Sequence, residues 1–291
     1  MVWSTTGRRM QPKPMAEART YLEEKKIPTF STPDGSARAL ETLVRGTFRP
    51  DFQIKPLPKS RTHPLIETAK KESRHLLEPE AFQLLGDNGI PVLPSVMAKN
   101  RQDAQEAARH FGGSVVLKVI SPQVLHKTDI GGVKVGLRGP EDVGRAYEDI
   151  LANVRAARPD AEIRGVLVVP EAEPGLEIII GMVKDNQFGP VMMFGCGGVF
   201  VEVFRDVSFR LAPFGVDVAV DMITETQAFE LLRGSRGSKP ADLRSLANLM
   251  AKVSKIGAAY RDVSAIDLNP VRVYRKGFAI LDARFVLGVG G

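Results

Sequence analysis

The sequence predicts an α/β fold of two lobes with a cleft between them, preceded by a short βα segment and a linker. Helix-like and strand-like stretches alternate from Glu78 to Val169, and strand-like stretches dominate after Pro174. Four prolines stand among basic residues between Thr47 and Pro64, which is typical of an extended linker. A length of 291 residues is sufficient for two compact units with buried cores.

The part of the chain ahead of the lobes is predicted to have little packed structure. Residues 1–48 should form a βα unit without a sheet of its own, made of a helix over 15–26, a strand over 27–30, a turn over 32–35 and a helix over 36–45. The basic linker follows over residues 49–75. A new domain is therefore expected to start near Leu76.

The two lobes are expected over residues 76–164 and 165–291. For the first lobe the pattern predicts helices over 78–88, 101–111 and 140–157, and strands over 92–98, 114–119 and 133–137. For the second it predicts strands over 165–169, 176–183, 191–193, 271–274 and 278–283, and helices over 224–232 and 240–260. The candidate functional residues fall where strands end.

Composition and charge exclude several classes of protein. Hydrophobic residues make up 43% and charged residues 25%, as in ordinary globular proteins. The basic surplus lies in residues 1–75, with 15 Lys and Arg against 8 Asp and Glu, whereas residues 76–291 hold 25 against 26. A nearly neutral body with few aromatics disfavours nucleic acid as a partner.

The sequence also gives no sign of a membrane or of export. No apolar run reaches the roughly 18 residues of a membrane span, and residues 1–14 lack the apolar core of a secretory signal. The single cysteine, Cys196, has no partner for an internal disulfide and fits a reducing cytoplasm. We therefore expect a cytoplasmic protein.

The segment from Ser121 to Gly136 carries the clearest functional signal. Lys118 ends the apolar strand just before it, where its ammonium group would stand at a fixed point in a cleft and neutralise phosphate oxygens. Gly131 and Gly132 would let a backbone loop approach a polyphosphate and point N–H groups at it. A surface hairpin with a Gly-Gly turn and two solvated lysines explains the same spacing equally well. The spacing matches neither a Walker A loop nor a dinucleotide fingerprint.

His126 lies inside this segment, between Leu125 and Lys127. A lone histidine is more often a structural or surface residue. Here its imidazole would lie beside candidate phosphate-binding cations, and imidazole can accept a phosphoryl group covalently. Both interpretations of His126 stay open on the residues alone.

A second group of candidate residues lies near the C-terminal end. Two adjacent strands in a hairpin would place Asp267 and Asn269 on one strand and Asp282 on the other, with their oxygen atoms converging. Hard oxygen ligands of this kind suit Mg²⁺ that bridges phosphates, because Mg²⁺ needs only one or two protein carboxylates. An Asx turn before Pro270 and a salt-bridged Asp282 account for the same residues equally well.

A third group follows the glycine-rich stretch around Cys196. Glu202, Asp206 and Arg210 share one parity along the next segment and offer further candidate side chains. The same alternation is typical of the solvated face of an amphipathic hairpin. No histidine lies near Cys196 in the sequence, which disfavours a thiol nucleophile there.

Taken together, these segments resemble a known family. The segments are LKVISPQVLHKTDIGGV from Leu117, FGCGGVFVEVFRDVSFR from Phe194, LRGSRG from Leu232 and DLNPV from Asp267. They resemble, in the same order, the ATP-grasp portion of the NDP-forming acyl-CoA synthetases. That family includes the ADP-forming acetate–CoA ligases and is related to succinyl-CoA synthetase. The similarity runs from about Leu76 to Val286.

The resemblance implies an ATP-grasp fold that clamps Mg-ATP or Mg-ADP between two lobes. It also implies a reaction that interconverts acyl-CoA, phosphate and ADP with carboxylate, CoA and ATP through an acyl phosphate and a phosphohistidine. His126 would match a histidine that some members are thought to use as a phosphoryl relay. Further implied roles are phosphate contact by Lys118, Lys127, Gly131 and Gly132, adenine contact by the backbone of Val168 and Val169, ribose contact by Glu177, and magnesium binding by Asn269 and Asp282 with Asp267 beside them.

The resemblance further implies a partner. Residues 16–47 are similar to the end of the CoA-ligase half that precedes the ATP-grasp half in fused members, so the chain resembles the C-terminal part of a longer architecture. The sequence lacks the glycine-flanked histidine expected for the principal phosphohistidine. We therefore expect an α-type, CoA-binding subunit or domain that carries that histidine, in a hetero-oligomer, and no turnover by the chain alone.

One departure leaves an alternative function open. Where the family usually has a Gln-Glu pair after Gly165-Val-Leu-Val, this sequence has Val169-Pro170, with Glu171 one place later. Proline has no N–H to donate where adenine is expected. The chain could thus be a degenerate ATP-grasp module that acts as a regulatory or scaffolding subunit. A carboxylate–amine ligase is disfavoured because such enzymes do not need the His126 segment.

Overall fold

The computed structural model describes residues 2–3, 17, 20–22, 24–25, 29–30, 58–197, 206–234 and 239–288. The chain divides into two compact units, Met1–Pro56 and Leu57–Gly291. In the first unit, β1 (Val2–Trp3) pairs in parallel with β2 (Thr29–Phe30). The helix predicted over 15–26 is described only in part, with residues 17, 20–22 and 24 helical, and the helix predicted over 36–45 lies outside the described residues.

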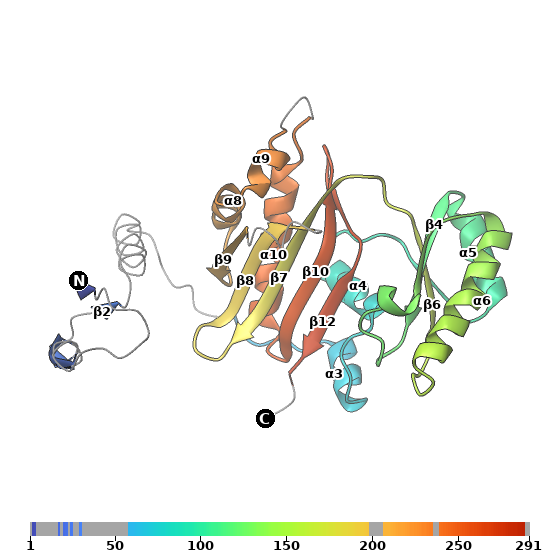
Figure 1. Ribbon diagram of the computed structural model, residues 1–291, viewed down its shortest axis with the longest axis horizontal. Helices are drawn as coiled ribbons and strands as arrows, with labels where there is room; N and C mark the ends of the chain where they lie inside the picture. The colour runs from blue at the N-terminus through green and yellow to red at the C-terminus, as the bar shows by residue number, and fades with distance from the viewer. Residues whose placement is uncertain are drawn as a thin grey trace. The chain divides into compact units, whose positions relative to one another are not determined.

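The second unit begins with a lobe built on a four-stranded antiparallel sheet of order β3-β6-β4-β5. Its strands are β3 (Val96–Ala98), β4 (Ser114–Ile120), β5 (Val133–Arg138) and β6 (Gly165–Pro170). Two helices, α5 (Arg101–Phe111) and α6 (Gly139–Ala157), pack against the sheet through a core that includes Leu117, Ile150 and Val166. Figure 1 shows both helices on the side of the sheet that faces away from the rest of the unit.

Local sequence explains where these helices start and stop. The side chain of Asn100 caps α5 by accepting a hydrogen bond from the backbone N–H of Asp103 at 2.9 Å. The same helix ends at Gly112, which adopts φ +67°, a conformation that glycine tolerates best. Pro140 stands in the first turn of α6, where a missing N–H removes no helical hydrogen bond.

The other lobe is built on a six-stranded sheet in which β11, β10, β7, β8 and β9 follow one another and β12 also pairs with β10. The strands are β7 (Leu176–Asp185), β8 (Gly189–Cys196), β9 (Val207–Leu211), β10 (Val263–Val273), β11 (Phe278–Ile280) and β12 (Ala283–Leu287). Its helices are α8 (Val216–Thr224), α9 (Ala228–Leu232) and α10 (Leu243–Ala259), and buried residues of all three share one core with the sheet.

The boundary between the lobes differs from the prediction. Strand β6 pairs with β3 and β4, so it belongs to the first sheet, and the chain crosses to the other lobe after Pro170 rather than before Gly165. The physical reason is that Val166 and Val168 complete the same core as Leu117. An apolar run of this kind indicates a buried strand, but it does not indicate to which of the two sheets the strand belongs.

Elements of the second lobe also differ in extent. The strand predicted over 271–274 is the end of β10, which begins at Val263, and the stretch predicted as one strand over 278–283 covers β11 and the turn before β12. The helix predicted over 224–232 is the end of α8 together with α9. Residues 225–227 separate the two helices. The Asp206 carboxylate accepts hydrogen bonds from the backbone N–H groups of Gln227 and Ala228 at the start of α9.

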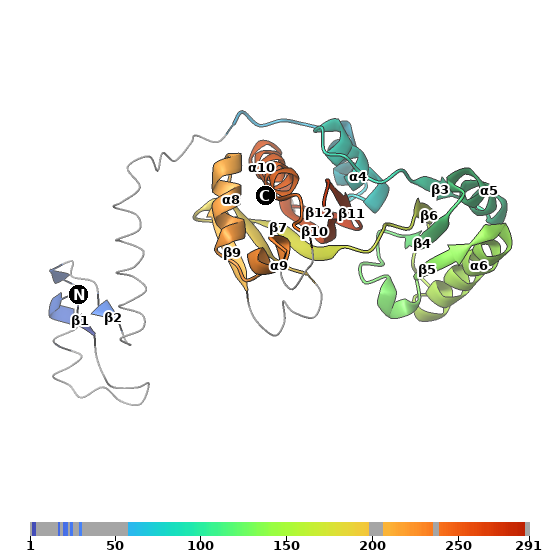
Figure 2. The same ribbon diagram turned by 90° about the horizontal axis from the view of Figure 1, so that it is seen from above.

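Two helices precede the first sheet in the chain but pack with the second lobe. Helix α3 (Pro64–Lys71) lies inside the stretch predicted as a linker, and α4 (Glu78–Asp87) follows it. Ile66 of α3 and Leu85 of α4 share a core with Phe285 of β12. In Figures 1 and 2, α4 lies between the two lobes. Pro64 stands at the first helical position of α3, where proline is tolerated, and the His63 ring caps the helix by accepting a hydrogen bond from the backbone N–H of Leu65.

Within the residues that the structure describes, no helix has the length and apolar character needed to cross a membrane.

Docking of α3 onto the second lobe can be tested at Ile66, whose side chain is 1% exposed. Replacing Ile66 with Ala should lower the free energy of unfolding by about 2–5 kcal/mol, because it leaves a cavity in the shared core. Chemical denaturation measures this change. The matched control is Lys71→Ala on the exposed face of the same helix, with an expected change below about 0.5 kcal/mol. If both variants unfold like the original chain, α3 is not packed there.

Candidate functional site

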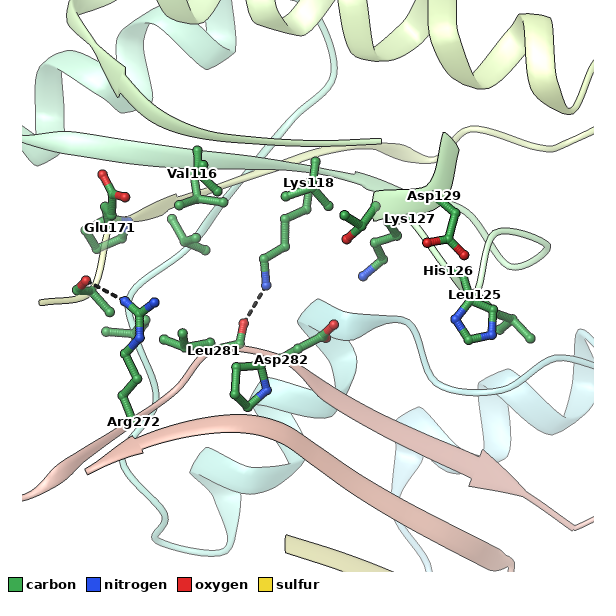
Figure 3. A pocket seen from close by; sticks show the side chains of 18 residues that line it. Val116, Lys118, Leu125, His126, Lys127, Asp129, Glu171, Arg272, Leu281 and Asp282 are labelled. Carbon is green, nitrogen blue, oxygen red and sulfur yellow. Dashed lines mark hydrogen bonds between the residues drawn. The ribbon is translucent and has the colours of Figure 1, made fainter. Parts of the chain in front are cut away.

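A cleft of about 370 Å³ lies between the lobes. One wall comes from β4, the end of β6 and the loop that follows β4, and the other comes from β10 and the connection between β11 and β12. Figure 3 shows Lys118 near the middle of this cleft, His126 toward one end, and Glu171 and Arg272 toward the other.

Lys118 points into the cleft because of its position on β4. Leu117 and Val119 fill the core under α5 and α6, so the side chain between them projects from the opposite face of the sheet. Lys118 is only 8% exposed. Its Nζ donates a hydrogen bond to the backbone oxygen of Leu281 at 2.5 Å, across the cleft.

Glu78 of α4 binds both lysines of the segment. One carboxylate oxygen lies 2.5 Å from Lys118 Nζ, and the other pairs with Lys127 Nζ. The Glu78 side chain is 2% exposed and those of Lys118 and Lys127 are 10% and 14% exposed. The structure therefore excludes the surface hairpin with two solvated lysines.

Charge explains the protonation of this cluster. Burial alone would raise the pKa of Glu78, but the charges of Lys118 and Lys127 outweigh it and lower that pKa. Burial alone would lower the pKa of Lys127, but the charges of Glu78 and Asp282 raise it. Glu78 and Lys127 are thus ionised at neutral pH.

Sequence reasoning missed Glu78. An acidic residue beside proline at a helix start is accounted for by the positive end of the helix dipole, so it gave no sign of a site. Its lysine partners lie 40 and 49 positions further along the chain. The only signal available was the apolar run that follows Glu78, which indicates a buried helix.

The glycines of the loop shape its path. Gly131 closes a short 3-10 turn with φ +66°, and its N–H donates to the oxygen of Thr128 at 3.1 Å. The N–H of Gly132 donates to the oxygen of Lys127 at 2.7 Å, and a Cβ there would come within 2.7 Å of Val119. Both N–H groups are thus used inside the loop, which differs from the expectation that they point at a ligand.

His126 has an exposed position at the wall of the cleft. It follows Leu125 and precedes Lys127, which turns into the cluster with Glu78 while His126 stays toward the outer end. The arrangement leaves the imidazole accessible from outside the cleft and separate from the buried ion pairs.

The other end of the cleft holds the residues expected at adenine and ribose. Val169 and Pro170 line the cleft, whereas Val168 is buried in the first core. Glu177 forms an ion pair with Arg272 at 2.9 Å, and Arg272 lines the cleft. The structure thus brings Val169 to the cleft directly and Glu177 to it through its ion-pair partner.

Of the three candidate magnesium ligands, Asp267, Asn269 and Asp282, only Asp282 lines the cleft. Asp282 lines the cleft between β11 and β12, not on a strand as predicted, while Asp267 and Asn269 lie on the exposed side of β10. Desolvation by surrounding atoms and then the charge of Glu78 raise the pKa of Asp282. Desolvation, followed by the charge of Asp282, raises the pKa of Asp267, so the two carboxylates are close enough to interact.

The two described residues of the third predicted group, Asp206 and Arg210, do not line the cleft. Asp206 caps α9, and Arg210 forms an ion pair with Glu225, so both serve the fold of the second lobe. Glu202 lies outside the described residues. Cys196 is buried, and burial raises the pKa of its thiol, which disfavours a thiolate.

A search of the described ranges for three or more His, Cys, Asp or Glu side chains around a common point finds no metal-binding cluster. Two carboxylates with an amide are a smaller donor set of the kind that Mg²⁺ accepts.

The fold has two lobes with paired lysines in the cleft between them, and comparison with known proteins identifies the family to which such a fold belongs. The chain belongs to the ATP-grasp domain family, which matches residues 67–287. It is 40% identical over 228 residues to the β subunit of acetate–CoA ligase [ADP-forming] I from Pyrococcus furiosus, which covers 78% of this chain and 98% of that subunit.

Two further relatives set the extent of the similarity. The chain is 40% identical over 279 residues to acetate–CoA ligase [ADP-forming] I from Archaeoglobus fulgidus, and the match covers 94% of this chain but 40% of that protein's length. The dinucleotide-forming acetyl-coenzyme A synthetase 1 of Candidatus Korarchaeum cryptofilum, solved with coenzyme A and Ca-AMPCP, is similar with a TM-score of 0.75 and 47% identity over 77% of this chain and 98% of that one. Another structure of that synthetase, solved with coenzyme A and Mg-AMPPCP, has a phosphohistidine segment that points towards the nucleotide-binding site.

The electrostatics of Asp282 predict a stability gain from its removal. Its pKa is raised above the ordinary value of 3.8, so its ionised form costs stability at neutral pH, and this cost disappears as the pH falls below about 3.8, where the carboxyl is protonated in both states. Asp282→Asn should therefore raise the melting temperature at about pH 8, with a gain that shrinks toward pH 4. Thermal unfolding across this range measures it.

The control for that measurement is Asp185→Asn, which should lower the melting temperature at neutral pH instead of raising it. Hydrogen bonds from the backbone N–H groups of Phe188 and Gln187 lower the pKa of Asp185, so its charge stabilises the fold above the ordinary pKa and that stabilisation is lost as the pH falls. A melting temperature that rises equally at all pH values for Asp282→Asn, or that falls at neutral pH, would show that its charge is not the cause.

Proposed function

We propose that this chain is the nucleotide-binding subunit or part of an ADP-forming acyl-CoA synthetase. In this role it transfers a phosphoryl group between a phosphohistidine and ADP. The observation that carries the proposal is the pair of buried, charged lysines in the cleft between the lobes. A buried cation pair of this kind fits the phosphates of a nucleotide, because phosphoryl transfer depends mainly on positioning and on charge stabilisation.

The cleft offers a distinct place for each part of the nucleotide. Lys118 and Lys127 would hold the phosphates, with Gly131 and Gly132 setting the path of the loop that carries Lys127. The backbone at Val168 and Val169 would meet the adenine, and Glu177 with Arg272 would lie near the ribose. Support for this orientation comes from the lining of the cleft, which runs from Lys127 toward one end to Glu171 and Arg272 toward the other and includes Val169.

The residues present fit Mg²⁺ at the phosphate end. Asp282 supplies hard oxygen atoms in the cleft, and Asp267 and Asn269 supply more from the neighbouring strand β10. Desolvation and then the charge of a neighbouring carboxylate raise the pKa of both Asp282 and Asp267, and a bound cation would offset that repulsion. Bound Mg²⁺ would neutralise charge on the phosphate oxygens. The chain's own residues position the nucleotide: the lysines neutralise its phosphates and the walls of the cleft exclude water.

His126 would act as a phosphoryl relay, and a partner would supply the rest of the reaction. When phosphohistidine reacts with ADP, its N–P bond breaks while a terminal phosphate oxygen of ADP bonds to the phosphorus, which yields ATP and free histidine. The chain spans 40% of the A. fulgidus ligase that it matches, so the acyl and CoA chemistry would belong to an α-type, CoA-binding subunit in a hetero-oligomer.

Nucleotide binding by the chain itself tests the first part of the proposal. The purified chain should bind Mg-ADP in isothermal titration calorimetry, and Lys118→Ala should weaken this binding at least tenfold, or about 1.4 kcal/mol, because a phosphate contact is lost. The control is Lys99→Ala, which removes an exposed lysine of the same lobe outside the cleft. Absence of binding at millimolar Mg-ADP would refute the proposal.

The relay role of His126 needs a second measurement with a CoA-binding partner subunit. His126→Ala should leave Mg-ADP affinity within about threefold of the original, because the imidazole lies outside the buried ion pairs, and should abolish acyl-CoA-dependent ATP formation in the mixture. The exposed His110 at the end of α5 provides the control as His110→Ala. Full turnover by His126→Ala would exclude the relay, and stable association without turnover by the unaltered chain would indicate a scaffold.

A further inference from the structure

Glu78 is the most buried charged group at the cleft, and none of the roles proposed above uses it. It stands in the first turn of α4 with its side chain 2% exposed. Each of its two carboxylate oxygens takes one ammonium group, from Lys118 at 2.5 Å and from Lys127. A carboxylate removed from water this completely is tolerated because each of its oxygen atoms meets an ammonium group at hydrogen-bonding distance.

The contact joins the two lobes. Helix α4 packs through Leu84 and Leu85 into the core that also holds Phe285 of β12. Lys118 belongs to a strand of the first sheet, and Lys127 belongs to the loop after it. Glu78 therefore fixes two side chains of the first lobe from a helix that is anchored in the second.

The surroundings leave Glu78 as the main acceptor for the lysines. Asp282 also lies near the lysines, but its distance to either ammonium group is longer than that of an ion pair. His75 and Arg284 line the adjoining small cavity; the His75 ring accepts a hydrogen bond from the N–H of Leu287, and the Arg284 guanidinium has no acceptor to offer a lysine. Leu281 contributes only a backbone oxygen, to Lys118. Lys127 thus has one close anionic partner among the described residues, and it is Glu78.

We propose that Glu78 is a positioning residue that holds Lys118 and Lys127 in place for the phosphates of the nucleotide. The inference rests on the proposed function. Lysine side chains are long and flexible, and ordering them during binding weakens affinity. With Glu78 in place, both ammonium groups already occupy fixed positions inside the cleft, and each keeps hydrogen atoms free for phosphate oxygens, since an ammonium group has three donors.

Two substitutions separate charge from shape at this position. Glu78→Gln keeps the size of the side chain but removes the charge, and Glu78→Asp keeps the charge on a shorter side chain. If Glu78 positions the lysines through its charge, Mg-ADP affinity measured by calorimetry should fall at least tenfold for Gln and stay within about threefold for Asp. A residue that only fills space would give the reverse order, because Gln is the better match in volume.

The control is Glu80→Gln, two residues along the same helix. Glu80 pairs with Arg74 and accepts from the N–H of Leu77, so its removal perturbs the start of α4 without touching either lysine. Its Mg-ADP affinity should match that of the original chain. Near-UV circular dichroism and thermal unfolding of each variant establish that the protein compared is folded.

Each outcome decides the question. Unchanged affinity in folded Glu78→Gln overturns the proposal, and so does tighter binding, which would mean that Glu78 competes with the nucleotide for the lysines. If Glu78→Gln does not fold because two buried ammonium groups lose their counter-charge, Glu78→Asp decides alone: a tenfold loss with an unchanged melting temperature overturns the proposal. If the original chain binds no Mg-ADP, the proposed function has failed, which is distinct from a failure of this inference.

Discussion

The site of this protein depends on one buried carboxylate placed between two ammonium groups. Removing Glu78, Lys118 and Lys127 from water costs several kcal/mol for each ion, and only their mutual attraction offsets that cost. Glu78 with one lysine is neutral, and the second lysine adds a buried positive charge, which the charge of Asp282 helps to offset. The cluster forms only when α4, β4 and the loop that carries Lys127 are all in place.

This requirement explains the packing of elements that precede the first sheet in the chain. Helix α4 must be held firmly for Glu78 to reach the lysines, and the apolar side of α4 provides that hold by joining the core of the second lobe. Helix α3 extends the same core through Ile66, and Leu76 between the helices donates its N–H to the oxygen of Phe285 at 3.3 Å. The segment ahead of α4 thus supports the cleft, although its prolines and basic residues are typical of a linker.

The features that could be predicted from the sequence are those that neighbouring residues determine. Lys118 was predictable because it interrupts an apolar strand, and a charge at such a position must face a cleft or be paired. The capped helix α5 was predicted at its observed bounds because Asn100 and Gly112 mark its ends. The family followed from four short segments in order. Glu78 was not predictable from the residues around it, because its meaning depends on partners at 40 and 49 positions' distance that only the folded chain brings near.

The assignment of strands to sheets was likewise beyond local pattern. The run of apolar residues in β6 is compatible with a buried strand in either lobe. Its pairing with β3 and β4 follows from the core that Val166 and Val168 complete. Long-range pairing also merges the Asp267 segment and the 271–274 segment into the single strand β10. Asp267 and Asn269 lie on a strand as predicted, whereas Asp282 lies in the connection between β11 and β12 and not on a strand.

The same strand fixes the opposite end of the cleft. Arg272 of β10 donates to the backbone oxygen of Ala172 at 2.9 Å, and Tyr274 donates to that of Glu173 at 3.1 Å, so the segment that carries the chain from one lobe to the other is tied to the second lobe. Glu78 ties the lobes together at the lysine end. Packing joins the lobes as well, because Ile120, Leu167 and Val169 of the first sheet belong to the same apolar core as α4 and the second lobe. Polar contacts at the two ends of the cleft and this shared core therefore hold the lobes together.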